Sequence, residues 1–153
     1  MDLHVRAAEI EDLDLMAGWA QAMALETEGK ALDADTVTRG IAAGLGDDAR
    51  ARYYVATVDG KPAGTLMLTY EWSDWRNGWW WWIQSVYVAP AHRRKGVYRA
   101  LYSHVLDLAR GEPEVCGLRL YVERENSTAQ RTYEFLGMVD AGYRMYEAET
   151  RRG

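Results

Sequence analysis

The period of the hydrophobic positions changes most clearly across residues 83–109. Residues 83–88 form an apolar, β-branched run that is typical of a buried strand. Pro90 ends this run, because proline cannot donate a hydrogen bond to a sheet ladder. From Val97 onward the apolar side chains recur at steps of three or four, so they share one face of a helix. The pattern therefore predicts a strand, a turn and a helix in this order.

The amino-terminal third of the chain predicts one short strand and two helices. Acidic residues fill the first turn of the first helix, where they suit the positive end of the helix dipole. An apolar stripe follows, and Gly29 breaks it. The expected segments are a strand at Leu3–Arg6, a helix from Ala7 to about Glu26, and a second helix that Asp33 or Asp35 caps and Gly44 and Gly46 end.

The middle of the chain predicts a β-hairpin and a further strand. Two apolar runs enclose Asp59-Gly60, a dipeptide that favours a tight turn. Asn77-Gly78 marks another turn ahead of four consecutive tryptophans, whose side chains alternate between the two faces of a strand. The expected strands are Arg52–Thr57, Lys61–Glu71 and Trp79–Val88.

The carboxyl-terminal third predicts two more strands around a helix. The expected segments are a strand at Gly117–Glu123, a helix at Asn126–Leu136 and a last strand at Met138–Glu147. The complete order is then β-α-α-β-β-β-α-β-α-β. A length of 153 residues without an internal repeat or linker favours one domain with a sizeable core.

Composition excludes several classes of protein. Hydrophobic residues make up 48% of the chain and charged residues 27%, which is typical of a globular protein. A net charge of −5 argues against general nucleic-acid binding, which normally shows a basic excess. The single cysteine excludes a disulfide framework, and the three histidines show no metal-ligand spacing, so no metal is expected. No signal peptide or membrane span stands out, so we expect a cytoplasmic protein without a membrane partner.

The turn between the strand and the helix at residues 83–109 is basic. Arg93, Arg94 and Lys95 come directly before Gly96 and the start of the helix. Backbone N–H groups at a helix N-terminus have no internal partner, and together with the helix dipole they form an anion site. Three cationic side chains beside it suggest a phosphate-rich ligand, although such a turn is also found as an ordinary solvated loop. The patterns of a P-loop and of a dinucleotide-binding turn are both absent.

This segment resembles the signature of the GNAT superfamily of acyl-CoA-dependent N-acetyltransferases. The signature is a strand, a V-x-P-type stop and then [QR]-x-x-G-x-[GA] at the start of a helix, which here reads residues 93–98. Tyr98 departs from it, since the family usually has Gly or Ala there. The opening R-x-A-x-x-x-D-L at Arg6–Leu13 also resembles the amino-termini of this family. The resemblance implies a single α/β (α+β) domain over residues 1–153, with a mixed, mostly antiparallel twisted sheet of about six strands and helices on both faces.

A second motif carries the resemblance into the carboxyl-terminal third. Asn126, Ala129, Tyr133 and Gly137 match the family's N-x-x-A-x-x-x-Y-x-x-x-G block. The resemblance implies that Asn126 lies near the pantetheine arm of CoA and that the Tyr133 hydroxyl lies near the CoA sulfur. Without the resemblance, these residues read as a helix cap and a core tyrosine.

The resemblance implies acetyl-CoA as the acyl donor and a direct attack by an amine. A backbone N–H on Val86–Val88 would meet the oxyanion, and Tyr133 would give a proton to the departing thiolate. The strands that contain Val86 and Tyr121 are expected to splay, so that the pantetheine arm completes the sheet between them. The implied acetyl-CoA contacts are Val86, Tyr87, Val88, Arg93, Arg94, Lys95, Gly96, Val97, Tyr98, Arg99, Asn126 and Ala129.

No general base is evident from the sequence. Many family members carry a glutamate near the position of Gln84, and glutamine cannot take a proton at neutral pH. Gln84 is therefore expected to orient a water or the substrate, or only to bond its neighbours in the strand. Each of the nearby acids reads first as an ordinary surface residue; those that could also serve as a base or bind the amine are Glu26, Glu28, Glu71 and Asp74.

Tryptophan is unusually abundant, and most of the seven lie between Trp72 and Trp82. One interpretation is a central strand covered on both faces, which needs large apolar side chains. Another is an aromatic acceptor pocket, which can hold a cationic group by cation–π attraction. We expect Trp80–Trp82 to be mainly structural and Trp72 and Trp75 to be more exposed. The expected acceptor contacts are Glu26, Trp72, Asp74, Trp75 and Trp82.

The function that the sequence predicts is transfer of an acetyl group from acetyl-CoA to a primary amine of a small molecule or peptide. One alternative is a non-catalytic GNAT-fold protein that binds acyl-CoA as a sensor, which Gln84 and Tyr98 permit. A second alternative, a nucleic-acid binder, would use the basic turn and the tryptophans. The negative net charge argues against it. The acceptor amine and its source, small molecule or protein, stay open, as does a homodimer.

Overall fold

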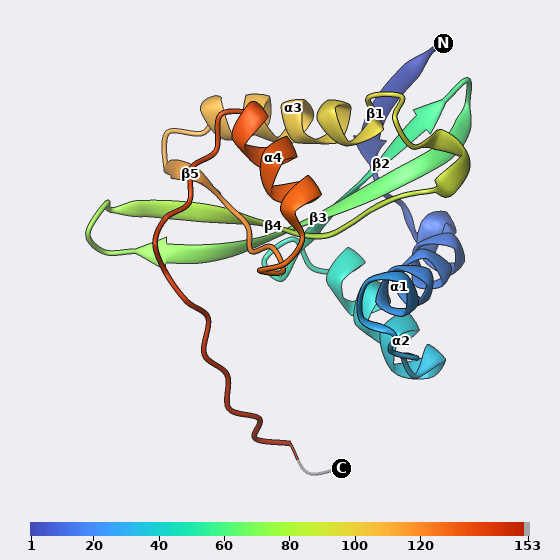
Figure 1. The fold of residues 1–153 in the computed structure, drawn as a ribbon, viewed down its shortest axis with the longest axis horizontal. Coiled ribbons are helices and arrows are strands. Elements are labelled where there is room, and N and C mark those ends of the chain that lie inside the picture. Colours follow the sequence, from blue (N-terminus) through green and yellow to red (C-terminus); the bar gives the residue numbers. More distant parts are fainter. Residues whose placement is uncertain (152–153) are drawn as a thin grey trace. The chain divides into compact units, whose positions relative to one another are not determined.

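The computed structural model describes residues 1–151, which form two compact units. The first unit is Met1–Leu120, and the second begins at Tyr121 (Figure 1). That they make up one domain, as the sequence predicts, stays a prediction.

The first unit contains a five-stranded mixed sheet with strand order β1-β2-β3-β4-β5. Neighbouring strands are antiparallel, except that β4 and β5 are parallel. The sheet is therefore mixed and mostly antiparallel, as predicted. Its elements are β1 (Leu3–Ala7), η1 (Ile10–Asp12), α1 (Leu13–Glu28), α2 (Ala34–Leu45), β2 (Arg52–Val58), β3 (Lys61–Ser73), β4 (Gly78–Val88), η2 (Pro90–His92), α3 (Val97–Arg110) and β5 (Val115–Arg119).

Helices cover both faces of this sheet, which confirms the prediction. Tyr53 of β2 packs with the apolar cluster of α1 and α2 that includes Met16 and Ile41. The next residue, Tyr54, meets His104 of α3 with ring centroids 5.1 Å apart. Successive side chains of a strand point to opposite faces, so α1 and α2 lie on one face and α3 on the other (Figure 1).

The turns and helix caps of the first unit follow their local sequence. Asp59-Gly60 joins β2 to β3, and both residues have the positive φ that a tight hairpin turn needs, 50° and 80°. Asp33 caps α2, where its carboxylate accepts a hydrogen bond from the Thr36 N–H at 2.9 Å. Of the two caps that the sequence allows, the structure has this one. Gly29 ends α1 in the left-handed conformation.

Within residues 121–151, the second unit has one helix, and the chain after it is neither helix nor strand. Helix α4 (Ser127–Phe135) begins at Asn126, whose side chain accepts a hydrogen bond from the Ala129 N–H at 3.1 Å. The predicted strand at Met138–Glu147 is wrong: within the described chain these residues form no strand. An apolar pattern gives a segment strand propensity, but a strand also needs a ladder partner. The sheet accordingly has five strands and not six.

Strand β5 is also shifted from its predicted position, Gly117–Glu123. It begins at Val115 and ends at Arg119, where its parallel pairing with Trp82 of β4 ends. The end of β5 is not set by the length of its partner, because β4 continues to Val88. None of the helices within residues 1–151 is both long and apolar enough to cross a membrane.

Candidate active site

A β-bulge interrupts β4 at its centre. Thr65 of β3 pairs with Tyr87, whereas Met67, two residues later, pairs with Gln84. Tyr87 and Gln84 are three residues apart on β4, whereas their partners on β3 are two residues apart, so β4 contains one extra residue here. Ser85 lies within this bulge and has a φ of 50°. The bulge places Gln84 and Tyr87 on the same face as Thr65 and Met67, which is the face that α1 and α2 cover.

One edge of β4 loses its neighbour just before the bulge. The parallel ladder between β4 and β5 ends at the pair Trp82 and Arg119, while β4 continues to Val88. On its other edge, β4 stays paired with β3 as far as Gly64 opposite Val88. Within the first unit, β4 therefore has no ladder partner on this edge beyond Trp82. An extended chain at this edge can bond to the backbone of β4 as a strand does.

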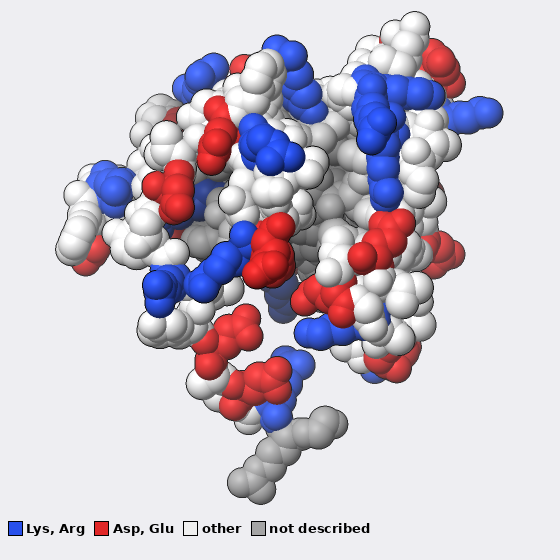
Figure 2. Space-filling model, in the orientation of Figure 1, with Lys and Arg blue, Asp and Glu red and all other residues white. Residues whose placement is uncertain are grey.

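The turn that follows β4 has the backbone of an anion site. Arg94 and Gly96 both lie in the left-handed region, with φ values of 64° and 81°. The Ala100 N–H donates to the Gly96 carbonyl at 3.0 Å, which is the four-residue spacing of an α-helix. The backbone N–H groups before Ala100 therefore come ahead of the helical hydrogen-bond pattern of α3. Residues 93–96 are exposed, and Lys and Arg side chains gather over this turn (Figure 2). The turn can bind a phosphate through backbone N–H groups and cations.

Arg93 links this turn to α1 and β4. Its Nη2 lies 3.0 Å from Oε2 of Glu26, and its Nε donates to the Val88 carbonyl at 2.9 Å. The guanidinium carbon also lies 5.4 Å from the centre of the Tyr87 ring. Arg93 was predicted to contact CoA and Glu26 to contact the acceptor. The structure places these two side chains together.

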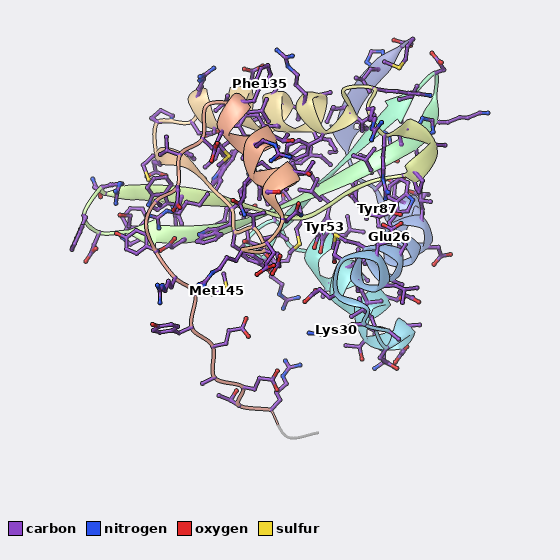
Figure 3. The ribbon with its side chains drawn as sticks, viewed as in Figure 1. Glu26, Lys30, Tyr53, Tyr87, Phe135 and Met145 are labelled. Carbon is purple, nitrogen blue, oxygen red and sulfur yellow. The ribbon has the colours of Figure 1, made fainter. Side chains whose placement is uncertain are left out.

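Tyr87 joins the basic turn to the interior of the first unit. Only 7% of the residue is exposed, and its hydroxyl lies 3.4 Å from Oε1 of Glu26 (Figure 3). Burial raises the pKa of the Tyr87 phenol, and the negative charge of Glu26 raises it further. Tyr87 is therefore protonated at neutral pH and can donate a hydrogen bond.

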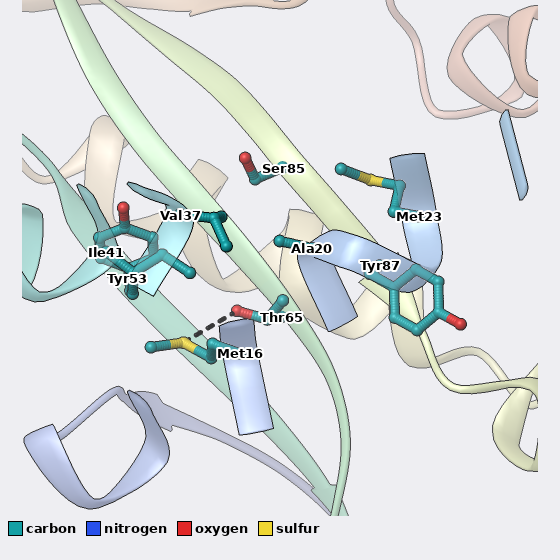
Figure 4. A pocket seen from close by; sticks show the side chains of 9 residues that line it. All are labelled: Met16, Ala20, Met23, Val37, Ile41, Tyr53, Thr65, Ser85 and Tyr87. Carbon is teal, nitrogen blue, oxygen red and sulfur yellow. Dashed lines mark hydrogen bonds between the residues drawn. The ribbon is translucent and has the colours of Figure 1, made fainter. Parts of the chain in front are cut away.

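A cavity lies beside the bulge, between the sheet and the helices α1 and α2 (Figure 4). Its volume is about 420 Å³, including the open mouth. The Thr65 hydroxyl at its wall donates to the Tyr54 carbonyl at 3.0 Å and so is satisfied within the protein. The lining residues are Met16, Ala20 and Met23 of α1, Val37 and Ile41 of α2, Tyr53, Thr65, Ser85 and Tyr87.

Gln84, the expected positioning residue, lies next to the bulge but does not line this cavity. Its amide Nε2 donates to the Thr69 hydroxyl at 2.8 Å. Its catalytic role stays a prediction. The hydrogen bond shows only that its amide is held by a neighbouring strand.

Glu71 belongs to a polar cluster on the same face of the sheet. Its Oε1 accepts hydrogen bonds from Trp82 Nε1 at 2.8 Å and from Arg119 Nη1 at 3.0 Å. The Arg119 guanidinium lies 4.0 Å from the ring centre of Trp80. Both hydrogen bonds hold the Glu71 carboxylate against the sheet, so its role as a base or as an amine-binding group stays a prediction.

The tryptophans divide between structural and exposed positions. Trp81 is only 4% exposed, whereas Trp72 and Trp75 are 47% and 88% exposed. Trp75 and Asp74 lie in the turn between β3 and β4. None of the predicted acceptor contacts, Glu26 included, lines the cavity, so their role in acceptor binding stays a prediction.

The second unit holds the expected proton donor. Tyr133 lies on α4 and is half-buried, and burial raises the pKa of its phenol. Asn126 and Ala129 bond to one another at the start of this helix. Their contacts with acetyl-CoA stay predictions.

Apart from Tyr87, which was predicted as an acetyl-CoA contact, the cavity residues were missed from the sequence. Methionines and aliphatic residues at helical spacing indicate a core face, and nothing in that spacing distinguishes a packed core from a cavity wall. Ser85 gave the one signal, as a small polar residue within an apolar strand. Within residues 1–151, no group of three or more His, Cys, Asp or Glu side chains is arranged to hold a metal ion.

The fold and site define a class of protein: a mixed α/β sheet whose strand β4 carries a bulge and is followed by a basic turn at the N-terminus of a helix. The sequence model of the Acetyltransferase (GNAT) family matches residues 13–138, and the chain belongs to this family.

Three known proteins illustrate the similarity. Streptothricin acetyltransferase from Streptomyces lavendulae is 37% identical over 99 residues, 63% of this chain. The chain spans about half of that relative's length, 49%. The structure of a possible acetyltransferase from Clostridium difficile 630 is 45% identical, with a TM-score of 0.91 over 98% of this chain and 99% of that one. A Clostridium acetobutylicum acetyltransferase structure with acetyl-CoA is 16% identical, with a TM-score of 0.76 over 96% of each chain, which shows the fold alone.

Proposed function

We propose that this protein transfers the acetyl group of acetyl-CoA to a primary amine. The observation that carries the proposal is the adjacency of two features in the first unit: the open edge of β4 beyond Trp82 and the anion-binding turn before α3. CoA combines an extended amide-containing arm with a diphosphate. Membership of the GNAT family supports the same assignment.

The donor would bind along β4 and its following turn. The backbone N–H groups of residues 94–99 would hold the diphosphate, with Arg94, Lys95 and Arg99 adding charge. The pantetheine arm would bond to the edge of β4 at residues 83–88. This places the thioester near the bulge, where a backbone N–H of Val86–Val88 can stabilise the oxyanion.

The acceptor would enter the cavity beside Ser85. Its neutral nitrogen attacks the thioester carbonyl, a C–N bond forms, and the C–S bond then breaks. The nitrogen loses one proton and the CoA thiolate gains one. We assign the donation to Tyr133 as general acid, because it matches the tyrosine of the family's N-x-x-A-x-x-x-Y-x-x-x-G block and its phenol carries a proton at neutral pH.

A thiol-release assay with acetyl-CoA and a panel of amines, amino acids and peptides tests the proposal. Streptothricin belongs in the panel, because the curated relative is named for it. We expect amine-dependent release of CoA, with the acetylated amine identified by mass spectrometry. Calorimetric binding of acetyl-CoA without turnover of any acceptor would instead support the acyl-CoA sensor. No binding at millimolar acetyl-CoA would refute both functions.

A further inference from the structure

The cavity beside the bulge is lined without charge. Of the nine side chains that form it within residues 1–151, none is an Asp, Glu, His, Lys or Arg. Two methionines, Met16 and Met23, supply flexible apolar surface, and Val37 and Ile41 add aliphatic surface from α2. Such a lining accepts apolar bodies of differing shape, because methionine adapts its side chain to what it contacts.

Among the described residues, the titratable groups that line the cavity are the phenols of Tyr53 and Tyr87. Burial raises the pKa of both phenols, so both are neutral at physiological pH. The carboxylate nearest to Tyr87 is Glu26, and Arg93 already neutralises it at 3.0 Å. Helix α2 contributes no titratable side chain to the lining.

An acceptor that carries a positive charge in addition to its reacting amine would therefore find no counter-charge in the lining of this cavity. Burying a charged ammonium without a counter-charge is costly, whereas hydrocarbon gains free energy on leaving water. The same environment disfavours the charged form of the reacting amine, so it favours the neutral form that attacks the thioester.

We infer that the acceptor is a primary amine carried on an uncharged, apolar body, and that it enters the cavity already deprotonated, without a carboxylate base in the protein. The inference rests on the proposed acetyl transfer and names its substrate class. The proton that the ammonium loses passes to solvent before attack. The proton that the nitrogen loses after attack also leaves to water, and the CoA thiolate takes its own proton as described above.

A matched pair of substrates tests the substrate class. Hexylamine and 1,6-diaminohexane have the same reacting amine and chain length, and they differ by one terminal ammonium. We expect kcat/KM for hexylamine to exceed that for the diamine by at least about tenfold, which corresponds to about 1.4 kcal/mol. Equal or faster turnover of the diamine would overturn the inference and leave the acetyl transfer standing.

A substitution in the cavity wall should change this preference. Met23→Glu places a carboxylate on the lining and should raise kcat/KM for the diamine relative to hexylamine. Met23→Gln is the matched control, because it has the same length without the charge, and it should keep the preference for hexylamine. If Met23→Glu proves unfolded by circular dichroism, Ala20→Leu serves instead: it fills the cavity and should raise KM for hexylamine while leaving acetyl-CoA affinity unchanged. Unchanged kinetics in a folded variant would place the acceptor elsewhere.

The pH profile tests the absence of a protein base. Hexylamine and benzylamine differ in the pKa of the free amine, and log kcat/KM should rise with pH until it levels at the pKa of whichever amine is used. A rising limb that levels at the same pH for both substrates would identify a base of the protein and overturn this part of the inference. Absence of turnover with every amine, while acetyl-CoA binds, would refute the proposed function itself.

Discussion

Two residues with positive φ shape the candidate site. Ser85 takes up the extra residue of the bulge at φ 50°, and Gly96 begins α3 at φ 81°. A Cβ atom at Gly96 would meet nothing within 4 Å, so packing inside the protein does not require glycine there. The backbone conformation favours it, since a side chain in the left-handed region is strained.

Gly96 also offers a test of where the diphosphate binds. Gly96→Asp should weaken acetyl-CoA binding at least about tenfold more than Gly96→Asn, because the two side chains have nearly the same shape and only aspartate repels phosphate. Both residues tolerate positive φ better than other non-glycine residues, which keeps the strain matched. Tyr98→Gly, which restores the usual family residue, should change the affinity less than Gly96→Asp. Calorimetric titration measures all three. Equal affinities for the Asp and Asn variants would place the phosphates elsewhere.

Tyr133 offers a test of the general acid. Tyr133→Phe keeps the ring and its packing and removes only the hydroxyl, so turnover should fall by about 10²-fold or more. Acetyl-CoA affinity should change little. Tyr146→Phe is the matched control, because that residue is 88% exposed and should lose no activity. A folded Tyr133→Phe enzyme with full turnover would remove Tyr133 from the mechanism and leave water as the proton donor.

Among the secondary-structure elements, an ion pair fixes the junction between β1 and α1. Arg6 donates from Nη1 and Nη2 to the Asp12 carboxylate at 2.7 and 2.9 Å, and the Glu9 N–H donates to the same carboxylate at 2.8 Å. These hydrogen bonds lower the pKa of Asp12, with Arg6 as the main cause. The contact orients the first helix, which supplies three residues of the cavity.

This junction predicts a pH-dependent stability. Because the pKa of Asp12 is lower in the folded state, its contribution is present above its unfolded pKa of about 3.9 and is lost as the pH falls through the folded value. Asp12→Asn should lower the free energy of unfolding by about 2 kcal/mol at neutral pH. The difference from wild type should shrink toward zero in acid, as urea titrations at several pH values would show.

Asp35→Asn provides the control for this comparison. Asp35 pairs with Arg39 at 3.2 Å on an exposed face of α2, where an ion pair contributes about 0.5 kcal/mol or less. A pH-independent loss in Asp12→Asn would show that its effect arises from packing and not from the charge.

At the scale of the whole molecule, the described chain after α4 has neither helix nor strand. It carries exposed apolar side chains, among them Val139 and Tyr146 at 85% and 88% exposure. Backbone without a hydrogen-bonded ladder opens to proteases more readily than sheet or helix does.

Brief trypsin treatment tests this description. We expect cleavage first after Arg144, with Arg52 at the start of β2 cut much later, because Arg52 belongs to the central sheet. Mass spectrometry of the first fragments identifies the site. Protection of Arg144 equal to that of Arg52 would show that the segment has found a partner in solution, either another part of the chain or a second copy.

The sequence by itself determined the local features of this protein. The change of period across residues 83–109 predicted the strand, the turn and helix α3, and dipeptides such as Asp59-Gly60 predicted the hairpin turn. A cap at Asp33 or Asp35 and a cap at Asn126 were also predicted, and the structure has Asp33 and Asn126. Each of these depends on residues a few positions apart, so the local sequence contains the information. The two family motifs added the order of the elements.

The tertiary structure alone decided the features that join distant segments. Ser85 becomes the bulge only because β3 sets the register opposite β4, and Arg93 meets Glu26 across 67 positions of sequence. The cavity collects residues from two helices and three strands. Residues Met138–Glu147 also show that tertiary structure decides: their pattern favours a strand, but within the described residues no strand pairs with them. Periodicity shows which side chains share a face, but pairing between strands and packing between elements decide what that face meets.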